Sequence, residues 1–321
     1  MLDQAPQVHT RSGLVRGVWQ DGSAAFLGIP FAEPPIGDRR FGRPVPPAPW
    51  DGVLDATRWG PTPQRRPLKP GGTLVPEPSI AGDSTLNVSV FTPRPGEPDA
   101  GLPVLVWIHG GGFVAGSAAN PWTSGAAFAR DGVVTVNLSY RLGFDGFGWI
   151  ADAPVNRGVL DWLLALEWVR DTIAEFGGDP ARVTIAGQSA GAGAVLTLLA
   201  VPRAAGLFHR AISLSGVVAD VPLARAEAIG RALAARAGVE PTRAGLSRLT
   251  EDQILDLQQA TAPLDAAAAG SDPFGGLTAL MASGLPWGPV VDGDLIPEPA
   301  ARAIAGGAGA AVEHAGGGGR G

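Results

Sequence analysis

Residues 182–200, RVTIAGQSAGAGAVLTLLA, indicate the fold class more clearly than any other part of the sequence. Residues 182–186 form a short apolar run, which predicts a buried strand, and residues 192–200 form a longer apolar run, which predicts a helix. Between them lies Gly187-Gln188-Ser189-Ala190-Gly191, a G-x-S-x-G pentapeptide. Such a pentapeptide between a strand and a helix predicts a sharp turn that presents the serine hydroxyl.

Ser189 is the candidate nucleophile of this turn. A serine at that place needs strained backbone with no Cβ atoms crowding it, and Gly187 and Gly191 provide the room on either side. The following helix directs its first N–H groups, and the positive end of its dipole, at an oxygen that gains negative charge.

The segments around this stretch alternate between strand and helix patterns. Residues 104–108 and 133–138 are continuous aliphatic runs that predict buried strands, whereas apolar residues in 160–176 recur at helical spacing. Gly177 predicts the end of that helix, and residues 211–214 predict a further strand. The alternation predicts an α/β fold, in which helices flank a central, mostly parallel sheet.

A second glycine-rich motif, His109-Gly110-Gly111-Gly112-Phe113, directly follows the strand predicted over 104–108. Consecutive glycines let backbone N–H groups approach a ligand closely, as an oxyanion hole requires. By itself, in so glycine-rich a chain, the triplet is more typical of a flexible turn. Its pairing with the serine motif, about 80 residues downstream, favours the oxyanion interpretation.

The two motifs resemble the type-B carboxylesterase family, which also includes the cholinesterases. The similarity covers roughly residues 8–300. Further similar stretches are Phe26–Pro30, Ala32–Pro35, Leu86–Pro93, Asn137–Gly143, Phe176–Pro180, Leu207–Ala211 and Gly288–Gly293. The resemblance implies an α/β-hydrolase fold and a serine carboxylesterase that acts on small-molecule carboxylic esters without a cofactor or a metal.

Roles for individual residues follow from the same resemblance. It implies that Ser189 is the nucleophile and that the N–H groups of Gly111, Gly112 and Ala190 hold the oxyanion. Three further positions match residues that surround this machinery. His109 would support the glycine loop, Ser215 would orient the catalytic acid, and Gln188 stands where many relatives have Glu.

The C-terminal part departs from the family pattern. Family members continue beyond the Gly288–Gly293 motif into segments that carry the catalytic acid and base, whereas this sequence ends at residue 321. We therefore expect an α/β-hydrolase domain over residues 1–305 that is truncated on its C-terminal side. Residues 306–321 are rich in glycine and lack apolar periodicity, so we expect a disordered tail there rather than a strand.

None of the four histidines matches the family's catalytic base, which an activated serine requires. His109 is expected to be structural, and His209 to be an ordinary surface or core residue. His9 is expected to be solvated, and His314 would need an ordered tail to reach Ser189. The acid and the base are accordingly left unassigned.

Two aspartates and three tryptophans lie near the motifs without a predicted chemical role. Asp292 and Asp294 flank Gly293, where turn formation and capping explain them. The tryptophans are expected in the core rather than as ligand-stacking groups; they are Trp162, Trp168 and Trp287.

Composition narrows the remaining possibilities. The hydrophobic fraction of 45% predicts a globular chain, and the lack of cysteine excludes disulfides and thiolate chemistry. A formal charge of -6 disfavours nucleic acids and anionic membranes as partners. The sequence shows no secretory signal and no apolar run long enough to span a membrane, so a cytoplasmic location is expected. It does not indicate the oligomeric state.

Two functions compete at this point. The first is hydrolysis of carboxylic esters through an acyl-enzyme on Ser189. The second is a catalytically inactive fragment or binding protein that lacks the triad acid and base, because loss of the base lowers the rate by orders of magnitude.

Overall fold

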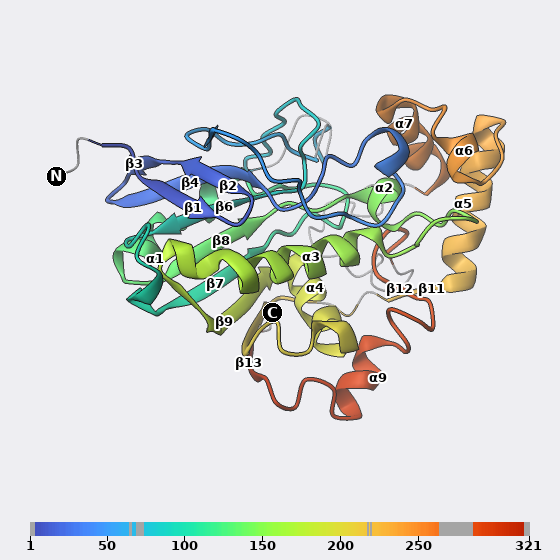
Figure 1. Ribbon diagram of the computed structural model, residues 1–321. Coiled ribbons are helices and arrows are strands. Elements are labelled where there is room, and N and C mark those ends of the chain that lie inside the picture. The colour runs from blue at the N-terminus through green and yellow to red at the C-terminus, as the bar shows by residue number, and fades with distance from the viewer. Residues whose placement is uncertain are drawn as a thin grey trace.

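The computed structural model describes residues 4–63, 66–68, 74–216, 218, 220–262 and 285–317. Within these residues, the main sheet has eight strands in the order β13-β10-β9-β7-β8-β6-β4-β3 (Figure 1). The five strands from β13 to β8 run parallel, and the pairs β8–β6, β6–β4 and β4–β3 are antiparallel. The expectation of a mostly parallel sheet flanked by helices therefore holds on the side that carries the serine motif.

The parallel strands include all those predicted from apolar runs. Strand β9 is longer than predicted because it starts at Gly178, where a register shift in its pairing with β7 accommodates the extra residues. The bounds are β7 Leu102–Ile108, β8 Val134–Leu138, β9 Gly178–Gln188, β10 Arg210–Leu214 and β13 Glu313–Gly317.

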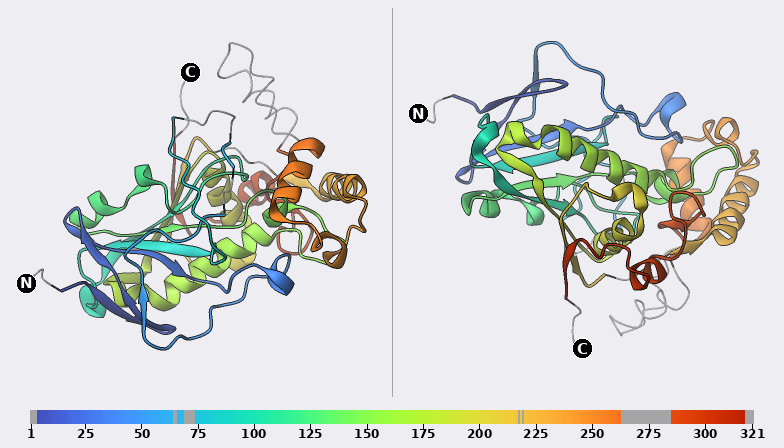
Figure 2. Two further views of the ribbon diagram at one scale, coloured as in Figure 1. Left: turned by 90° about the horizontal axis from the view of Figure 1, so that it is seen from above. Right: turned by 60° about the horizontal axis from the view of Figure 1, so that its bottom comes forward.

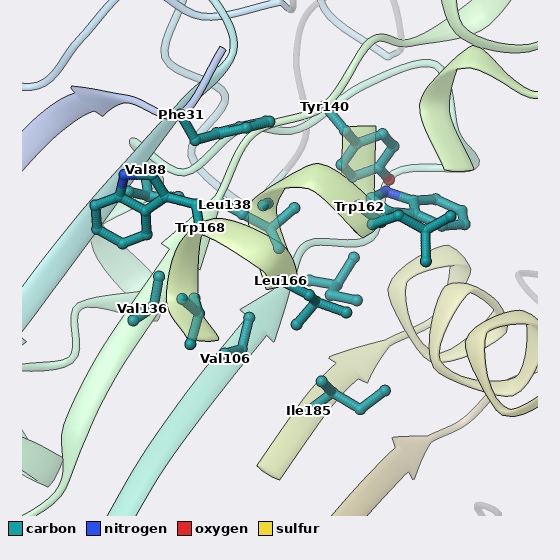
Figure 3. Packing of buried hydrophobic residues seen from close by; sticks show 14 of the residues in the cluster. Phe31, Val88, Val106, Val136, Leu138, Tyr140, Trp162, Leu166, Trp168 and Ile185 are labelled. Carbon is teal, nitrogen blue, oxygen red and sulfur yellow. The ribbon is translucent and has the colours of Figure 1, made fainter. Parts of the chain in front are cut away.

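Two helices cover one face of the sheet. They are α3, Arg157–Thr172, and α4, Ala190–Ala200, and their apolar side chains share one core cluster with those of the strands. Figure 3 shows α3 side chains such as Trp162 and Leu166 above Val106 of β7. A short 3-10 helix, η4 (Ile173–Phe176), continues α3 and ends at Gly177, whose φ of 82° is the left-handed conformation that glycine allows.

The opposite face carries α1, Ala126–Arg130. Successive residues of a strand point to opposite faces, and Ala25 and Leu27 of β4 accordingly pack with α1 whereas Phe26 packs in the main core. The antiparallel strands are β3 Val18–Gln20, β4 Ser23–Pro30 and β6 Asn87–Thr92. A separate small sheet contains β1 Gln7–Thr10, β2 Gly13–Arg16 and β5 Val53–Asp55.

Further helices gather at one end of the molecule, away from the N-terminus (Figures 1 and 2). Sequence periodicity did not single them out. They are α2 Gly143–Phe147, α5 Leu223–Ala237, α6 Arg243–Leu246 and α7 Glu251–Thr261. Short strands β11, Val221–Pro222, and β12, Val290–Val291, pair beside α5. Among the helices of the described residues, none combines the length and apolar character that a membrane span requires.

A buried ionic network joins the segment after β8 to helix α3. Arg141 makes three hydrogen bonds to the carboxylate of Asp161, the shortest of 2.6 Å, and both side chains are almost completely buried. Nearby, the guanidinium of Arg157 donates to the carbonyl oxygens of Phe144, Asp145, Gly148 and Pro154. Burial lowers the pKa of Arg157 to about 9. The network fixes the start of α3 relative to α2.

The prediction of a disordered tail without a strand is wrong for residues 313–317. They form β13, which pairs in parallel with β10 from Arg210↔Glu313 to Leu214↔Gly317. A strand is held by main-chain hydrogen bonds, which glycine can make, so the absence of an apolar pattern does not exclude pairing. The ion pair between Arg210 and Glu313, 2.8 Å long, lies at its beginning, and helix α9, Ala300–Ala305, precedes it.

Candidate active site

Ser189 occupies a strained turn between β9 and α4. Its φ and ψ are 57° and -122°, a combination that non-glycine residues rarely adopt and that costs roughly 1–3 kcal/mol. Although it is the N-cap residue of α4, its side chain makes no capping hydrogen bond. The half-buried hydroxyl is therefore not engaged by the helix that it precedes.

The two glycines of the pentapeptide are required by close packing. A Cβ atom on Gly187 would lie 2.4 Å from the carbonyl oxygen of Gly191. A Cβ atom on Gly191 would lie 2.0 Å from the carbonyl oxygen of Ile108, the last residue of β7. The start of α4 thus sits directly on the neighbouring strand end, as the sequence pattern predicted for a tight turn.

The glycine loop after β7 lies against the serine turn. A Cβ atom on Gly110 would be 2.7 Å from the carbonyl oxygen of Gln188 and 3.3 Å from Cβ of Ser189. The chain then turns sharply, with φ values of 113° at Gly111 and 61° at Gly112. The structure therefore brings the two sequence motifs, separated by about 80 residues, into contact.

Three N–H groups at this junction have no hydrogen-bond acceptor among the residues that the structure describes. Within the described part of the chain, the amides of Gly111, Gly112 and Ala190 donate no hydrogen bond. The carbonyl of Gly111 instead accepts bonds from the amides of Val114 and Ala115, which fixes the loop's shape. Unpaired N–H groups held rigidly beside a serine hydroxyl can stabilise a developing oxyanion.

His109 lies beneath this loop and not beside the hydroxyl. Its Nδ1 is 2.8 Å from the carbonyl oxygen of Gly110, and its ring stacks on Tyr140 with centroids 4.4 Å apart. Because the carbonyl only accepts, Nδ1 carries the proton in this contact. Burial lowers the pKa of His109 to about 4, so the ring is neutral near pH 7. The hydroxyl of Tyr140 donates to the carbonyl of His109, 3.1 Å away.

Ser215 and Ser189 lie at equivalent positions, directly after the last paired residues of the neighbouring strands β10 and β9. The register pairs Leu214 with Gln188, and the amide of Ser189 donates to the carbonyl of Leu214 over 3.1 Å. Ser215 follows directly, is exposed, and also has a positive φ, of 53°. Gln188 is exposed as well.

The other three histidines lie away from this junction. His209 precedes Arg210, whose partner Thr184 is five residues, or about 16 Å along the strand, before Ser189. His314 pairs with Ala211, which in turn pairs with Ile185. His9 belongs to β1, in the separate small sheet. The register thus leaves the base of Ser189 unassigned.

Asp292 has the turn role expected of it. Oδ1 of Asp292 accepts from the amides of Asp294 and Ile296, at 3.1 and 2.9 Å. Its Oδ2 accepts from Asn156, which also exchanges two hydrogen bonds with the backbone of Val290. Sequence reasoning missed Asn156, because its partners lie more than 130 residues away.

Two other features of the site bear on its chemistry. In the part of the chain that the structure describes, no group of three or more His, Asp or Glu side chains could hold a metal ion. The three tryptophans expected in the core are indeed buried, with exposed fractions of 0%, 9% and 2% for Trp162, Trp168 and Trp287.

Comparison with known sequences identifies a family. A family model described as the carboxylesterase family matches residues 4–318. Para-nitrobenzyl esterase of Bacillus subtilis is 43% identical over 217 residues, which are 65% of this chain and 43% of that protein. Liver carboxylesterase of Sus scrofa is 39% identical over 278 residues, 78% of this chain and 48% of that protein. The chain spans about half the length of the curated relatives it matches.

Solved structures give the same result. A carboxylesterase of Geobacillus stearothermophilus superposes with a TM-score of 0.81 and 33% identity, covering 97% of this chain and 60% of that one. A PNB esterase gives a TM-score of 0.81 and 33% identity, covering 99% of this chain and 64% of that one. The α/β-hydrolase fold expected from the sequence is thereby confirmed.

Proposed function

The chain belongs to the carboxylesterase family, and from this premise we propose that it hydrolyses small-molecule carboxylic esters through an acyl-enzyme on Ser189. The observation that carries the proposal is the junction of two motifs. The strained serine turn touches the glycine loop at Gly110, and the N–H groups of Gly111, Gly112 and Ala190 have no acceptor there among the described residues.

The reaction follows from this arrangement. The hydroxyl oxygen of Ser189 attacks the ester carbonyl carbon and releases its proton, and the carbonyl oxygen becomes an oxyanion held by the three amides. Collapse of this tetrahedral species expels the alcohol and leaves an ester on Ser189. Attack by water through a second such species releases the carboxylic acid and restores the hydroxyl.

The group that accepts the proton of Ser189 is not assigned. His109 points into the loop, where its pKa of about 4 makes it a poor base at neutral pH, and the other histidines lie elsewhere. An oxyanion hole and substrate binding alone support about 10³–10⁴-fold acceleration over water. The chain spans about half the length of its curated relatives. Ester hydrolysis by the whole protein is therefore part of the proposal.

A binding protein without turnover is the competing function, and it rests on this unassigned base. Both functions are tested by adding p-nitrobenzyl acetate, chosen because a relative is named para-nitrobenzyl esterase. We expect release of p-nitrobenzyl alcohol that falls at least about a thousandfold in Ser189→Ala. Ser213→Ala, a change on the neighbouring strand β10, is the matched control and should keep the activity.

A fluorophosphonate distinguishes the two functions. We expect one fluorophosphonate per chain, located on Ser189 by peptide mass spectrometry. Covalent labelling without ester turnover would favour the binding protein, and neither labelling nor turnover would refute the esterase.

A further inference from the structure

The three proposed oxyanion donors differ in what fixes their direction. In a planar trans peptide the N–H group points away from the carbonyl of the preceding residue, so a partner of that carbonyl orients the N–H group. The carbonyl of Ser189 accepts from Gly193 within α4 and thereby directs the N–H group of Ala190. The carbonyl of Gly111 accepts from two amides of its own loop and thereby directs the N–H group of Gly112. Backbone hydrogen bonds thus orient two of the three donors.

The third donor, the N–H group of Gly111, depends on a side chain. The carbonyl that precedes it belongs to Gly110, and its oxygen is 2.8 Å from Nδ1 of His109. Because Nδ1 donates to this carbonyl, the Gly111 N–H group points away from the imidazole. The placement of the His109 ring therefore sets the direction of one oxyanion donor.

Hydrogen bonds alone do not fix the His109 ring. Its other nitrogen, Nε2, is buried and has no hydrogen-bond partner among the described residues. The bond from Nδ1 fixes one point at the edge of the ring, and a ring held at one point can still tilt. The plane of the imidazole must therefore be held by packing.

Tyr140 contacts His109 in two ways. Its ring stacks on the imidazole, with centroids 4.4 Å apart and planes 15° from parallel. Its hydroxyl donates to the main-chain carbonyl of His109 over 3.1 Å. Burial raises the pKa of the Tyr140 hydroxyl, so the hydroxyl keeps the proton that it donates. One side chain thus holds both the ring and the backbone of His109.

Tyr140 is itself fixed by its surroundings. Its side chain is completely buried, and its ring makes edge contacts with Trp162 of α3 and Phe147 of α2, at centroid distances of 5.2 and 6.5 Å. Figure 3 shows Tyr140 beside Trp162. The next residue, Arg141, is held by its buried ion pair with Asp161. A rigid core therefore extends through Tyr140 to the glycine loop.

We propose that Tyr140 is a positioning residue for the oxyanion hole. By holding His109, it keeps the N–H group of Gly111 directed at the oxyanion. The inference rests on the proposed function, because an oxyanion forms only when Ser189 attacks an ester. The direction of the Gly111 amide can be followed without any turnover, so the two claims can fail separately.

The structural part is tested with Tyr140→Phe, which removes the hydroxyl and keeps the ring. The carbonyl of His109 then lacks this donor in a buried place, and the loop must move to reach another. In proton–nitrogen NMR spectra of the chain we expect the amide resonance of Gly111 to shift. A Gly111 resonance that is the same in Tyr140→Phe and the wild type would overturn the proposal.

Trp168→Phe is the matched control. It also removes part of a buried aromatic side chain, but Trp168 lies further along α3 and its ring contacts Phe176. It should leave the Gly111 resonance in place. A shift of equal size in both variants would overturn the proposal, because it would show a general response to a weakened core.

Kinetics test the catalytic part. With p-nitrophenyl acetate as substrate, Tyr140→Phe should lower kcat at least about tenfold and leave KM within about twofold, because the misplaced donor acts mainly in the transition state. Trp168→Phe should keep both constants. An unchanged kcat in Tyr140→Phe would overturn the proposal. If the wild type hydrolyses nothing, the proposed function fails, whereas a shifted Gly111 resonance would still support the role of Tyr140 in the loop.

A double variant tests whether Tyr140 acts through His109. His109→Phe removes the Nδ1 donor and keeps an aromatic ring beside Tyr140. In this background we expect the further change Tyr140→Phe to lower kcat by less than about twofold, because both side chains act on the same peptide. A further tenfold loss would contradict a route through His109.

The wild-type side chain offers a measurement that does not depend on the folding of any variant. The sequence contains one tyrosine, so incorporation of 3-fluorotyrosine places fluorine on Tyr140 alone. Phosphonylation of Ser189 puts a phosphoryl oxygen on the three amides and should shift the fluorine NMR resonance through Gly110 and His109. An unchanged resonance in a fully phosphonylated chain would overturn the proposal.

Discussion

The carbonyl oxygen of Ile108 lies 2.0 Å from the place that a Cβ atom of Gly191 would occupy. Ile108 ends β7 and Gly191 is the second residue of α4, so the helix rests directly on the end of the neighbouring strand. The glycine loop starts at the next residue of the chain, which is why the loop and the serine turn share one edge of the sheet.

This contact predicts the effect of Gly191→Ala. The added methyl group meets backbone rather than a flexible side chain, so the helix or the strand must move, at a cost of roughly 1–3 kcal/mol or more in the free energy of unfolding. Urea unfolding measures it. Gly42→Ala, whose new Cβ would have no neighbour closer than 3.5 Å, is the control and should change stability little. Equal stability of both variants would contradict the packing.

Gly110→Ala is expected to separate activity from stability. Its Cβ would press on the carbonyl of Gln188 at 2.7 Å and on Ser189, which displaces the loop from the serine turn. Misplacing an oxyanion donor costs about 10²–10³-fold in kcat. Ester hydrolysis and thermal unfolding should be measured together. A Gly110→Ala chain that folds and keeps full activity would show that the loop has no catalytic part.

The buried pair Arg141–Asp161 predicts a large loss on removal of one partner. Asp161→Asn leaves the guanidinium buried without a counter-charge, which costs about 3–5 kcal/mol. Glu227→Gln breaks the exposed pair with Arg231 instead and should cost less than about 0.5 kcal/mol. Chemical denaturation of both variants checks this; similar losses would mean that the buried pair is not important for stability.

His109 predicts a pH dependence of stability. Its pKa is about 4 in the folded chain and about 6.5 when unfolded, so between pH 6.5 and pH 4 the unfolded state gains a proton that the folded state does not. Stability should therefore fall by about 3 kcal/mol between pH 6.5 and pH 4 and should lose no more from this group at lower pH.

The contribution of His109 is measured as the difference between the wild type and His109→Gln, in which the other titrating groups cancel. His209→Gln, a change at an exposed histidine, serves as control and should retain the wild-type slope. If the free energy of unfolding depends on pH in His109→Gln as it does in the wild type, a group other than His109 takes up the proton.

The serine turn and the glycine loop were predictable because each is a local pattern in which glycine is required by backbone geometry. Residues 182–200 therefore indicated strand, turn and helix, and the structure confirms that order. The contact between the motifs followed from the ends of parallel strands meeting at one edge of the sheet.

Features built from distant partners were not predictable. Asn156 joins residues 290–292 to the start of α3 through bonds to Val290 and Asp292, and no local sequence pattern predicts such a pairing. The cavity lined by Ile36, Leu142 and Trp287 combines residues more than 100 positions apart for the same reason. Strand β13 was missed because main-chain hydrogen bonds hold it against β10. Every residue that carries an N–H group can make such bonds, so a glycine-rich sequence can form a strand without an apolar pattern.

In the proposed reaction, three backbone amides hold the oxyanion that forms at Ser189. A crystal structure of the chain after reaction with a p-nitrophenyl phosphonate tests it most directly. We expect phosphorus bonded to Oγ of Ser189 and the phosphoryl oxygen about 2.7–3.1 Å from the amide nitrogens of Gly111, Gly112 and Ala190. Phosphorus on another residue, or a phosphoryl oxygen directed away from these amides, would contradict it.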